Sequence, residues 1–352
     1  MKRIVAILLS LVFILGMLAG CGSSSTAPAS ETPDQTTTQP ETEAADSGSS
    51  EVYEMVIALH TNEGTVESNA VYRFKDAVEE KSNGRLKVSV FTGATLGSEE
   101  ENLEQIGTGE IQGSIFGDVM TSQLAADLDP TVTPFLFSNV EDVLAVWAGE
   151  VGERINEACK ENGNLRVLGV GRRGARYLLA NEPITTPEEC RGLKLRLPSI
   201  ANWVTIWEQV GALPTPIAFS EVYTSLQTGV VDAFESTAEL TYTGSYYEVV
   251  KYAIDTHHLY GLFHLAVCES WLQSLPADLQ ELIINEGAEC CAWGDEQTAL
   301  YESEMVQALI DNGMEVVTPD AEAFKAAAMP AIEKIVEQWQ DGIWEAIEQY
   351  VT

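Results

Sequence analysis

Apolar runs alternate with amphipathic stretches along residues 51–170. Met55–Leu59 is a short apolar run, and Leu86–Phe91 alternates apolar and polar positions, so both predict strands. Between these strands, apolar residues recur at helical spacing, at Val66, Ala70, Phe74, Ala77 and Val78. With a third strand at Ile111–Phe116, residues 51–117 predict a β-α-β-α-β succession, which favours a parallel sheet covered by helices.

Two helix starts are marked by a serine followed three residues later by a glutamate, the spacing of a capping box. Ser98 with Glu101 marks one start, and Ser138 with Glu141 marks another. The second of these helices has an apolar face made of Val143, Leu144, Trp147, Val151 and Ile155. A strand is expected next, at Leu165–Val170.

The second half of the chain continues the alternation. Strands are expected at Tyr177–Ala180, Lys194–Leu197, Val230–Phe234 and Leu262–Cys268. Helices are expected at Ala201–Val210 and Glu221–Thr228, each followed by a glycine that can end it. From Pro276 onward the chain is mainly helical, apart from a short strand at Met314–Val317. The length of 352 residues suits two α/β units of about 150 residues each.

Residues 1–50 differ from the rest of the chain. Two basic residues precede an apolar stretch that ends in Leu-Ala-Gly-Cys at Cys21, an order typical of a secretory signal. This ending resembles the lipobox of bacterial lipoproteins, which implies that residues 1–20 are removed and Cys21 is lipidated. A plain signal peptide and a single-span anchor are the alternatives. Residues 21–50 lack large apolar side chains, so we expect them to form a flexible tether.

The chain is strongly acidic, with 54 Asp and Glu against 19 Lys and Arg and a formal net charge of −35. Such a field repels phosphate, which excludes nucleic-acid binding and disfavours an anionic membrane surface. The positive charges are concentrated between residues 166 and 196, at Arg166, Arg172, Arg173, Arg176, Arg191, Lys194 and Arg196. They fall at the end of one predicted strand, in the next loop and on a later strand, where open α/β sheets bind ligands.

Arg196 stands inside the predicted strand Lys194–Leu197, on the opposite face from the two leucines of that strand. An arginine held on a strand is oriented to grip a carboxylate through two parallel hydrogen bonds. A solvated charged edge, or salt bridges to nearby acids, would explain the same cluster of arginines. The residues alone leave both interpretations open.

Sequence motifs for catalysis or metal binding are missing. The four histidines lack metal-ligand spacing, and no nucleophile elbow, P-loop or dinucleotide-binding glycine motif is present. We therefore predict no enzyme activity, no cofactor and no metal. Five cysteines follow residue 50, an odd number that cannot all pair, and we expect mostly buried thiols. A disulfide between Cys159 and Cys190 is left open.

One stretch resembles a known family signature. Phe219–Asp232, which reads FSEVYTSLQTGVVD, closely resembles the signature of solute-binding proteins of tripartite ATP-independent periplasmic (TRAP) transporters, the DctP family. Further pieces resemble the family in the same order along the chain: Asn83-Gly84-Arg85, Thr95-Leu96-Gly97, Pro134–Phe137, Pro183–Glu188, Gly192–Pro198, Gly211–Pro214 and Glu248–Tyr252. Each piece is short, and their common order over residues 52–300 makes the resemblance specific.

The resemblance implies an α/β fold of the two-lobed periplasmic-binding-protein kind, type II-like. Each lobe is expected to hold a mainly parallel sheet flanked by helices, and the C-terminal helices are expected to cross between the lobes. The implied boundaries are residues 51–172 with about 262–301 for one lobe, and residues 173–261 with about 302–352 for the other.

The resemblance also implies a site for an organic anion between the lobes. Arg196 falls at the family's carboxylate-gripping arginine, and Arg176 falls at a second family arginine. Ser236 stands where the family commonly has asparagine, and a hydroxyl has a shorter reach and fewer donors. This exchange favours a more apolar pocket. The other lining candidates are Trp203, Phe234, Tyr242, Asp118 and the loop from His60 to Asn62.

The implied function is capture of a small organic acid, which could be a monocarboxylate, a dicarboxylate or a uronate-like acid. The protein would deliver this acid to TRAP membrane subunits, which import it with an ion gradient. We expect an exported monomer, held by its lipid on the outer face of the cytoplasmic membrane, at the cell surface or in the periplasm. A sensory receptor of the same fold is the alternative, and a secreted lipoprotein enzyme is a more distant one.

Overall fold

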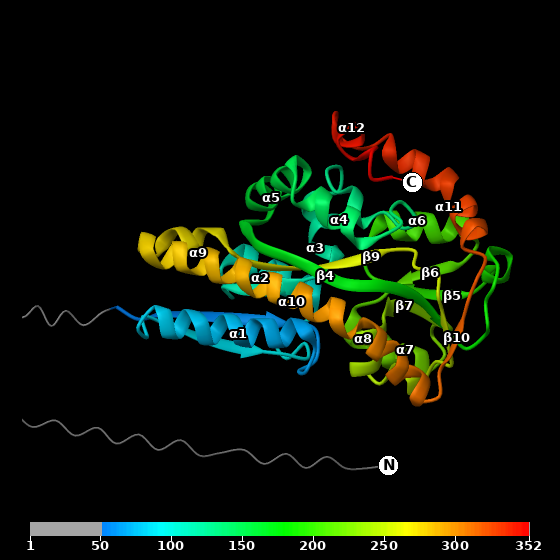
Figure 1. Cartoon of the computed structure of the whole chain (residues 1–352), viewed down its shortest axis with the longest axis horizontal. Coiled ribbons are helices and arrows are strands. Elements are labelled where there is room, and N and C mark those ends of the chain that lie inside the picture. The colour runs from blue at the N-terminus through cyan, green and yellow to red at the C-terminus, as the bar shows by residue number, and fades with distance from the viewer. Residues whose placement is uncertain (1–50, 352) are drawn as a thin grey trace, which may run out of the picture. The chain divides into compact units, whose positions relative to one another are not determined.

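The computed structural model describes residues 51–351, shown in Figure 1. The predicted signal segment, Cys21 and the tether lie outside the described residues. A ten-stranded mixed sheet runs in the order β2-β1-β3-β9-β4-β7-β5-β6, with β8 paired to β4 and β10 paired to β8. We call the strands on the β9 side of β4 (Leu165–Ala180) the first half of the sheet, and those on the β7 side the second half.

The first half of the sheet contains the predicted β-α-β-α-β succession. Its bounds are β1 Tyr53–Leu59, α1 Val66–Lys81, β2 Leu86–Phe91, α2 Glu99–Thr108 and β3 Gly113–Phe116. β1 pairs in parallel with both β2 and β3, which confirms the prediction of parallel strands joined by helices. β9 (Tyr260–Cys268) then pairs antiparallel with β3 and with β4, so the sheet is mixed.

The two predicted capping boxes have different outcomes. Ser98 accepts a hydrogen bond from the backbone of Glu101, whose carboxylate accepts one from the Ser98 backbone at 2.7 Å, so the first box is confirmed. The box predicted at residues 138 and 141 is wrong by one residue. Asn139 caps the N-terminus of α4 instead, because its side-chain oxygen accepts a hydrogen bond from the backbone of Asp142 at 2.9 Å.

The single helix expected after this cap is in fact two helices, α4 (Val140–Trp147) and α5 (Glu150–Gly163). The chain turns so tightly between them that a Cβ at Gly152 would overlap the carbonyl oxygen of Trp147. Apolar spacing does not reveal this break, because both helices bury their apolar residues in the same core.

β4 is one strand of 16 residues, where the sequence predicts two strands separated by a loop. Its first part pairs with β9 and its last part pairs with β7, and two register shifts against β9 leave the strand unbroken. The arginines expected in the loop, Arg172, Arg173 and Arg176, therefore lie on a strand. The prediction of a loop here is wrong because pairing of β4 with β9 continues as far as Ala175.

The second half of the sheet is built around β5, which pairs in parallel with β6 and β7. The bounds are β5 Lys194–Leu197, α6 Ala201–Val210, β6 Leu213–Pro216, α7 Val222–Gln227, β7 Ala233–Thr237 and α8 Ala238–Thr243. The bounds predicted for β5 and α6 are confirmed. β7 starts three residues later than expected, because Val230 is exposed in the turn after α7. The sequence pattern predicts no strand at β6, whose two prolines fit its position at the edge of the sheet.

The C-terminal helices contact both halves of the sheet. α10 (Ala277–Asp311) packs along β4 and contacts α1 at one end and α8 at the other (Figure 1). α11 (Ala321–Val336) packs on α6, and α12 (Ile343–Ile347) packs on α5. The expectation that these helices cross between the halves is confirmed. The remaining regular elements are α3 Asp118–Leu124, β8 Tyr252–Ile254, α9 Glu269–Ser274 and β10 Glu315–Val317.

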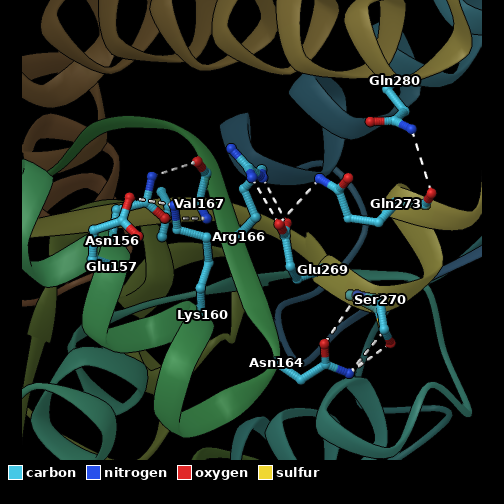
Figure 2. A network of polar contacts seen from close by, with 11 residues as sticks. Asn156, Glu157, Lys160, Asn164, Arg166, Val167, Glu269, Ser270, Gln273 and Gln280 are labelled. Carbon is cyan, nitrogen blue, oxygen red and sulfur yellow. Dashed lines mark hydrogen bonds and ion pairs between the residues drawn. The ribbon is translucent and has the colours of Figure 1, made fainter. Parts of the chain in front are cut away.

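Polar side chains fix the start of β4 against α9 (Figure 2). Asn164, which caps the C-terminus of α5, donates a hydrogen bond to the Ser270 hydroxyl at 2.8 Å and accepts one from the Ser270 backbone at 2.9 Å. Two residues later, Arg166 donates to both carboxylate oxygens of Glu269 at 2.6 and 2.7 Å. For Arg166, the structure therefore agrees with the alternative that basic residues of this cluster form salt bridges to nearby acids.

All five cysteines of the described residues are free and buried. Cys159 and Cys190 are therefore not joined to each other. Burial raises the pKa of both thiols to about 12, so they stay protonated and act as small core residues.

Candidate ligand-binding site

A cavity of about 30 Å³ lies at the C-terminal ends of β1, β3 and β5, the edge at which parallel strands present ligands. Residues from both halves of the sheet line it. The lining residues are His60, Glu99, Asp118, Val119, Arg173, Arg176, Arg196, Pro198, Ile200, Trp203, Phe219 and Leu240. Three buried arginines so close together need negative charge nearby. The carboxylates that pair with each arginine therefore determine which positive charge is left for a ligand.

Arg196 is buried on β5, with 2% of its surface exposed. Its Nε donates a hydrogen bond to the carbonyl oxygen of Ile217 at 2.8 Å, and its guanidinium lies 5.8 Å from the ring centroid of Phe219. No carboxylate of residues 51–351 forms an ion pair with it. Burial lowers the pKa of Arg196 to about 10, so it is still a cation at neutral pH.

Arg176, on β4, forms a buried ion pair with Glu235 of β7. The same carboxylate lies 3.6 Å from Nε2 of His258. Burial raises the pKa of Glu235, but Arg176 and His258 lower it more, so the carboxyl stays ionised. The guanidinium of Arg176 also stacks over Trp203, 4.9 Å from the ring centroid. Arg176 is thus held in place and neutralised within the protein.

Arg173 is a third cavity arginine that the sequence did not single out as a site residue. Its Nε donates to Glu67 of α1 at 2.5 Å, and both side chains are buried. Its Nη1 lies so close to Gly117 that a Cβ there would overlap it. The sequence did contain a signal for Arg173, because this residue belongs to the cluster of basic residues between 166 and 196. We expected Arg173 in a loop, and a loop does not determine which side chains point into a site, so the sequence did not identify it as a site residue.

Two acids complete the polar lining. Asp118 is the first residue of α3, Glu99 is the first of α2, and burial raises the pKa of each carboxyl to about 7. Glu99 accepts a hydrogen bond from the backbone of Gly117 at 2.5 Å and lies 3.7 Å from Nε2 of His60. Burial lowers the pKa of His60 to about 4, so its imidazole is neutral at pH 7.

The structure brings together five of the residues predicted for the site. They are Arg196, Arg176, Asp118, His60 and Trp203, which all line the cavity. Their contact with a ligand stays a prediction. Residues that the prediction missed include Arg173, Glu99 and Phe219. Phe219 is the first residue of the signature motif Phe219–Asp232, so the sequence did offer a reason to place it near the site.

The other predicted site residues do not line the cavity. Phe234 packs in the core against Tyr246, with ring centroids 4.6 Å apart, and Ser236 is fully buried on the same strand. Asn62 donates a hydrogen bond to the backbone oxygen of Thr243 at 3.2 Å. Tyr242 lies against another tyrosine ring. Contact of these side chains with a ligand also stays a prediction.

Neither a metal site nor a membrane span is found in the described part of the chain. Among residues 51–351, no three His, Cys, Asp or Glu side chains are arranged to hold a metal ion. None of the helices in that range is both long and apolar enough to cross a bilayer.

The chain matches a family model over most of its length. The model is that of the bacterial extracellular solute-binding proteins of family 7, DctP, and it matches residues 57–339. A solute-binding protein of Roseobacter denitrificans is 33% identical over 267 residues, which cover 75% of this chain and 81% of that protein. The C4-dicarboxylate-binding periplasmic protein DctP of Shewanella loihica is 27% identical over 283 residues, or 80% of this chain and 83% of that protein.

Solved structures of TRAP periplasmic solute-binding proteins have the same fold. One, from Roseobacter denitrificans with bound L-galactonate, has a TM-score of 0.81 and 29% identity, and the match covers 86% of this chain and 99% of that one. Another, from Sulfitobacter sp. with bound β-D-galacturonate, has a TM-score of 0.79 and 28% identity, covering 85% and 99%.

Proposed function

The chain belongs to the bacterial extracellular solute-binding proteins of family 7, the DctP family, and from this membership we propose that it captures a small organic acid and delivers it to TRAP membrane subunits. The family indicated by the signature motif is confirmed. Its members are substrate-binding transport proteins, so this protein is not an enzyme.

One observation carries the choice of an acid as ligand. Arg196 is buried at the cavity without a carboxylate partner among the described residues. A buried cation without a counter-ion is costly, and a ligand carboxylate would remove that cost. A guanidinium also has donors beyond its Nε, and these can bind both oxygens of a carboxylate.

The named ligands of relatives support the same class. The Roseobacter protein holds L-galactonate and the Sulfitobacter protein holds β-D-galacturonate, and both ligands carry a carboxylate. The Shewanella relative is named for C4-dicarboxylates. The cavity has room for only one or two water molecules, so binding of any such acid would require the site to open first.

Closure and location complete the proposal. The two lobes expected from the sequence would close on the ligand, and exclusion of water would strengthen its ion pair with Arg196. Residues 1–20 would direct export, and a lipid on Cys21 would hold the monomer on the outer face of the cytoplasmic membrane. The extracytoplasmic family supports this location.

Truncation of Arg196 tests the choice of ligand class. Titration calorimetry with L-galactonate, D-galacturonate and succinate first identifies an acid that binds the wild-type protein. We expect Arg196→Ala to weaken its binding by at least about 30-fold, because removing one partner of a buried charge pair costs about 2–5 kcal/mol.

Arg172→Ala is the matched control. Arg172 belongs to the same basic cluster, but it pairs with Asp295 at 2.9 Å and does not line the cavity. We expect this variant to bind the acid as the wild-type protein does. Unchanged affinity in the Arg196→Ala variant would contradict the role of Arg196, and failure of every organic acid to bind would contradict the ligand class.

A further inference from the structure

Two carboxyl groups share the cavity with Arg196. Asp118 and Glu99 both line it, and both are buried, with 6% and 8% of their surfaces exposed. The cavity measures about 30 Å³, so a carboxylate that reaches Arg196 must lie close to both acids. Negative charges gathered in one buried space repel one another strongly unless something balances them. The groups that can balance them therefore decide what accompanies the binding of an anion.

Neither carboxyl group has a cationic partner of its own. Within residues 51–351, no hydrogen bond or ion pair reaches the Asp118 carboxyl, since the Thr121 hydroxyl donates to the backbone oxygen of Asp118. Glu99 accepts a hydrogen bond from the backbone of Gly117 and lies 3.7 Å from Nε2 of His60. That imidazole is neutral at pH 7, because burial lowers its pKa to about 4. A proton is therefore the simplest group that can neutralise either carboxyl.

Charged groups of both signs surround the two carboxyls. Arg173 and Arg176 are nearby cations, but each already shares its charge with a buried glutamate. Burial outweighs both cations and raises the pKa of each carboxyl to about 7. The titratable and charged groups that face the two acids from the surrounding elements are Arg173 and Arg176 of β4, Arg196 of β5, Glu67 of α1, Glu100 of α2, His264 of β9, Cys159 of α5, His60 and Asp129.

We propose that capture of an organic anion at Arg196 is coupled to proton uptake by Asp118 and Glu99. In the opened site, water reaches both carboxyls and favours their ionised forms. When the site closes on an anion, a proton on each carboxyl removes its repulsion from the ligand. This inference rests on the proposed function, because it concerns what accompanies ligand binding at the same site.

The coupling fixes the sign of the pH dependence. A bound carboxylate adds negative charge beside groups whose pKa is already about 7 in the closed site, so it raises their pKa further. Linkage is reciprocal, so a ligand that promotes proton uptake binds more tightly where protons are abundant. This contribution to the affinity is present at low pH and is lost as the pH rises through the pKa of the bound form. Arg196 remains a cation throughout, since its pKa is about 10.

Titration calorimetry counts the protons directly. The wild-type chain is titrated at neutral pH with whichever of L-galactonate, D-galacturonate and succinate binds, once in PIPES and once in Tris. These buffers release protons with different heats, so the difference in binding heat gives the protons taken up per ligand. We expect at least about half a proton, and an affinity that falls about tenfold or more from pH 6 to pH 8.

Neutral variants test the two residues. Asp118→Asn and Glu99→Gln keep the size and hydrogen-bonding groups of the acids but cannot ionise. We expect the double variant to take up fewer protons and to lose most of the affinity difference between pH 6 and pH 8. Each single variant should lose part of both, so the test remains usable if the double variant does not fold. Asp76→Asn is the control and should change neither quantity, because Asp76 is exposed on α1 and does not line the cavity.

The outcomes separate the two proposals. Binding without proton uptake by the wild-type protein would overturn the coupling, and so would equal uptake by the wild-type protein and the neutral variants. If Arg196→Ala loses binding while the wild-type protein takes up no protons, the proposed function stands and the coupling is wrong. If none of the three acids binds, the proposed function is contradicted, and the inference with it. Circular dichroism and thermal melts confirm that each variant is folded.

Discussion

At the scale of single residues, the arginines of the cavity differ in their partners. Arg173 and Arg176 are each balanced by a glutamate, whereas Arg196 is not paired with any described carboxylate. All three have similar burial, so exposure does not separate them. An arginine paired with a carboxylate of the protein is therefore structural here, and the arginine without such a partner is the candidate for ligand binding.

Asp118 should make the folded protein less stable as the pH rises. Burial raises its pKa in the folded protein to about 7, from an ordinary value of 3.8. The folded state therefore binds a proton that the unfolded state releases, and the resulting stability, fully present below pH 3.8, is lost as the pH rises through 7. We expect Asp118→Asn, which is always neutral, to raise the melting temperature more at pH 8 than at pH 5.

Thermal melts of the wild-type protein and the variant at the two pH values measure this difference. Asp76→Asn again serves as control, because its side chain is exposed on α1. Equal shifts of the Asp118→Asn variant at pH 5 and pH 8 would show that the Asp118 carboxyl is not protonated in the folded state.

At the scale of secondary structure, the course of β4 decides which arginines reach the cavity. Its pairing with β9 continues to Ala175, and its pairing with β7 begins at Arg176. A strand fixes side-chain direction residue by residue, which a loop does not. Arg173 lies at the register shift between Arg172 and Gly174, Arg176 lies where pairing with β7 begins, and both line the cavity.

The cap of α4 has a measurable effect on stability. We expect Asn139→Ala to lower the free energy of unfolding by about 1 kcal/mol, because the backbone of Asp142 loses the hydrogen bond from which α4 starts. Asn139→Ser keeps a capping oxygen and should cost much less. Urea unfolding of both variants measures the difference, and equal stabilities would argue against a cap at Asn139.

At the scale of the whole described part, hydrogen bonds join the two halves beside the cavity. Glu239 of α8 accepts a hydrogen bond from the Val66 backbone at the start of α1, at 2.7 Å. Asn62 donates to the backbone oxygen of Thr243 at 3.2 Å. Each contact connects an element beside one half of the sheet to an element beside the other half. Both therefore stabilise the closed arrangement, in which the cavity between these elements is small.

Removal of the Glu239 contact should therefore weaken ligand binding without unfolding the protein. Burial raises the pKa of Glu239 to about 7, so its carboxylate is ionised at pH 8. A hydrogen bond to a charged group contributes about 1.5–3 kcal/mol, so we expect Glu239→Ala to weaken acid binding at pH 8 by about tenfold or more. Titration calorimetry measures the affinity, and small-angle scattering reports whether the ligand-free variant is more open.

Glu248→Ala is the control for this variant. Glu248 is an exposed acid that accepts a hydrogen bond from Tyr223 beside the same half of the sheet, so its loss should not change the affinity. Wild-type affinity in the Glu239→Ala protein would mean that this contact does not influence binding.

The sequence by itself determined the family and most local elements. β2, β5 and α6 have the bounds predicted from apolar spacing, and the capping box at Ser98 is present. The motif at Phe219–Asp232 indicated the family that the comparisons confirm. These features depend on residues close together in the chain, so local patterns are sufficient to reveal them.

Only the tertiary structure decided which charges are balanced. Arg173 and Glu67 are 106 positions apart, and Arg176 and Glu235 are 59 apart, so no local pattern reports either pair. The same is true of Phe234, which packs against Tyr246 in the core and does not line the cavity. Side-chain partners come from strands and helices brought together by the sheet. The sequence alone therefore identified the cluster of arginines. Only the fold showed that, among the arginines of the cavity, Arg196 is the one without a carboxylate partner in the described part of the chain.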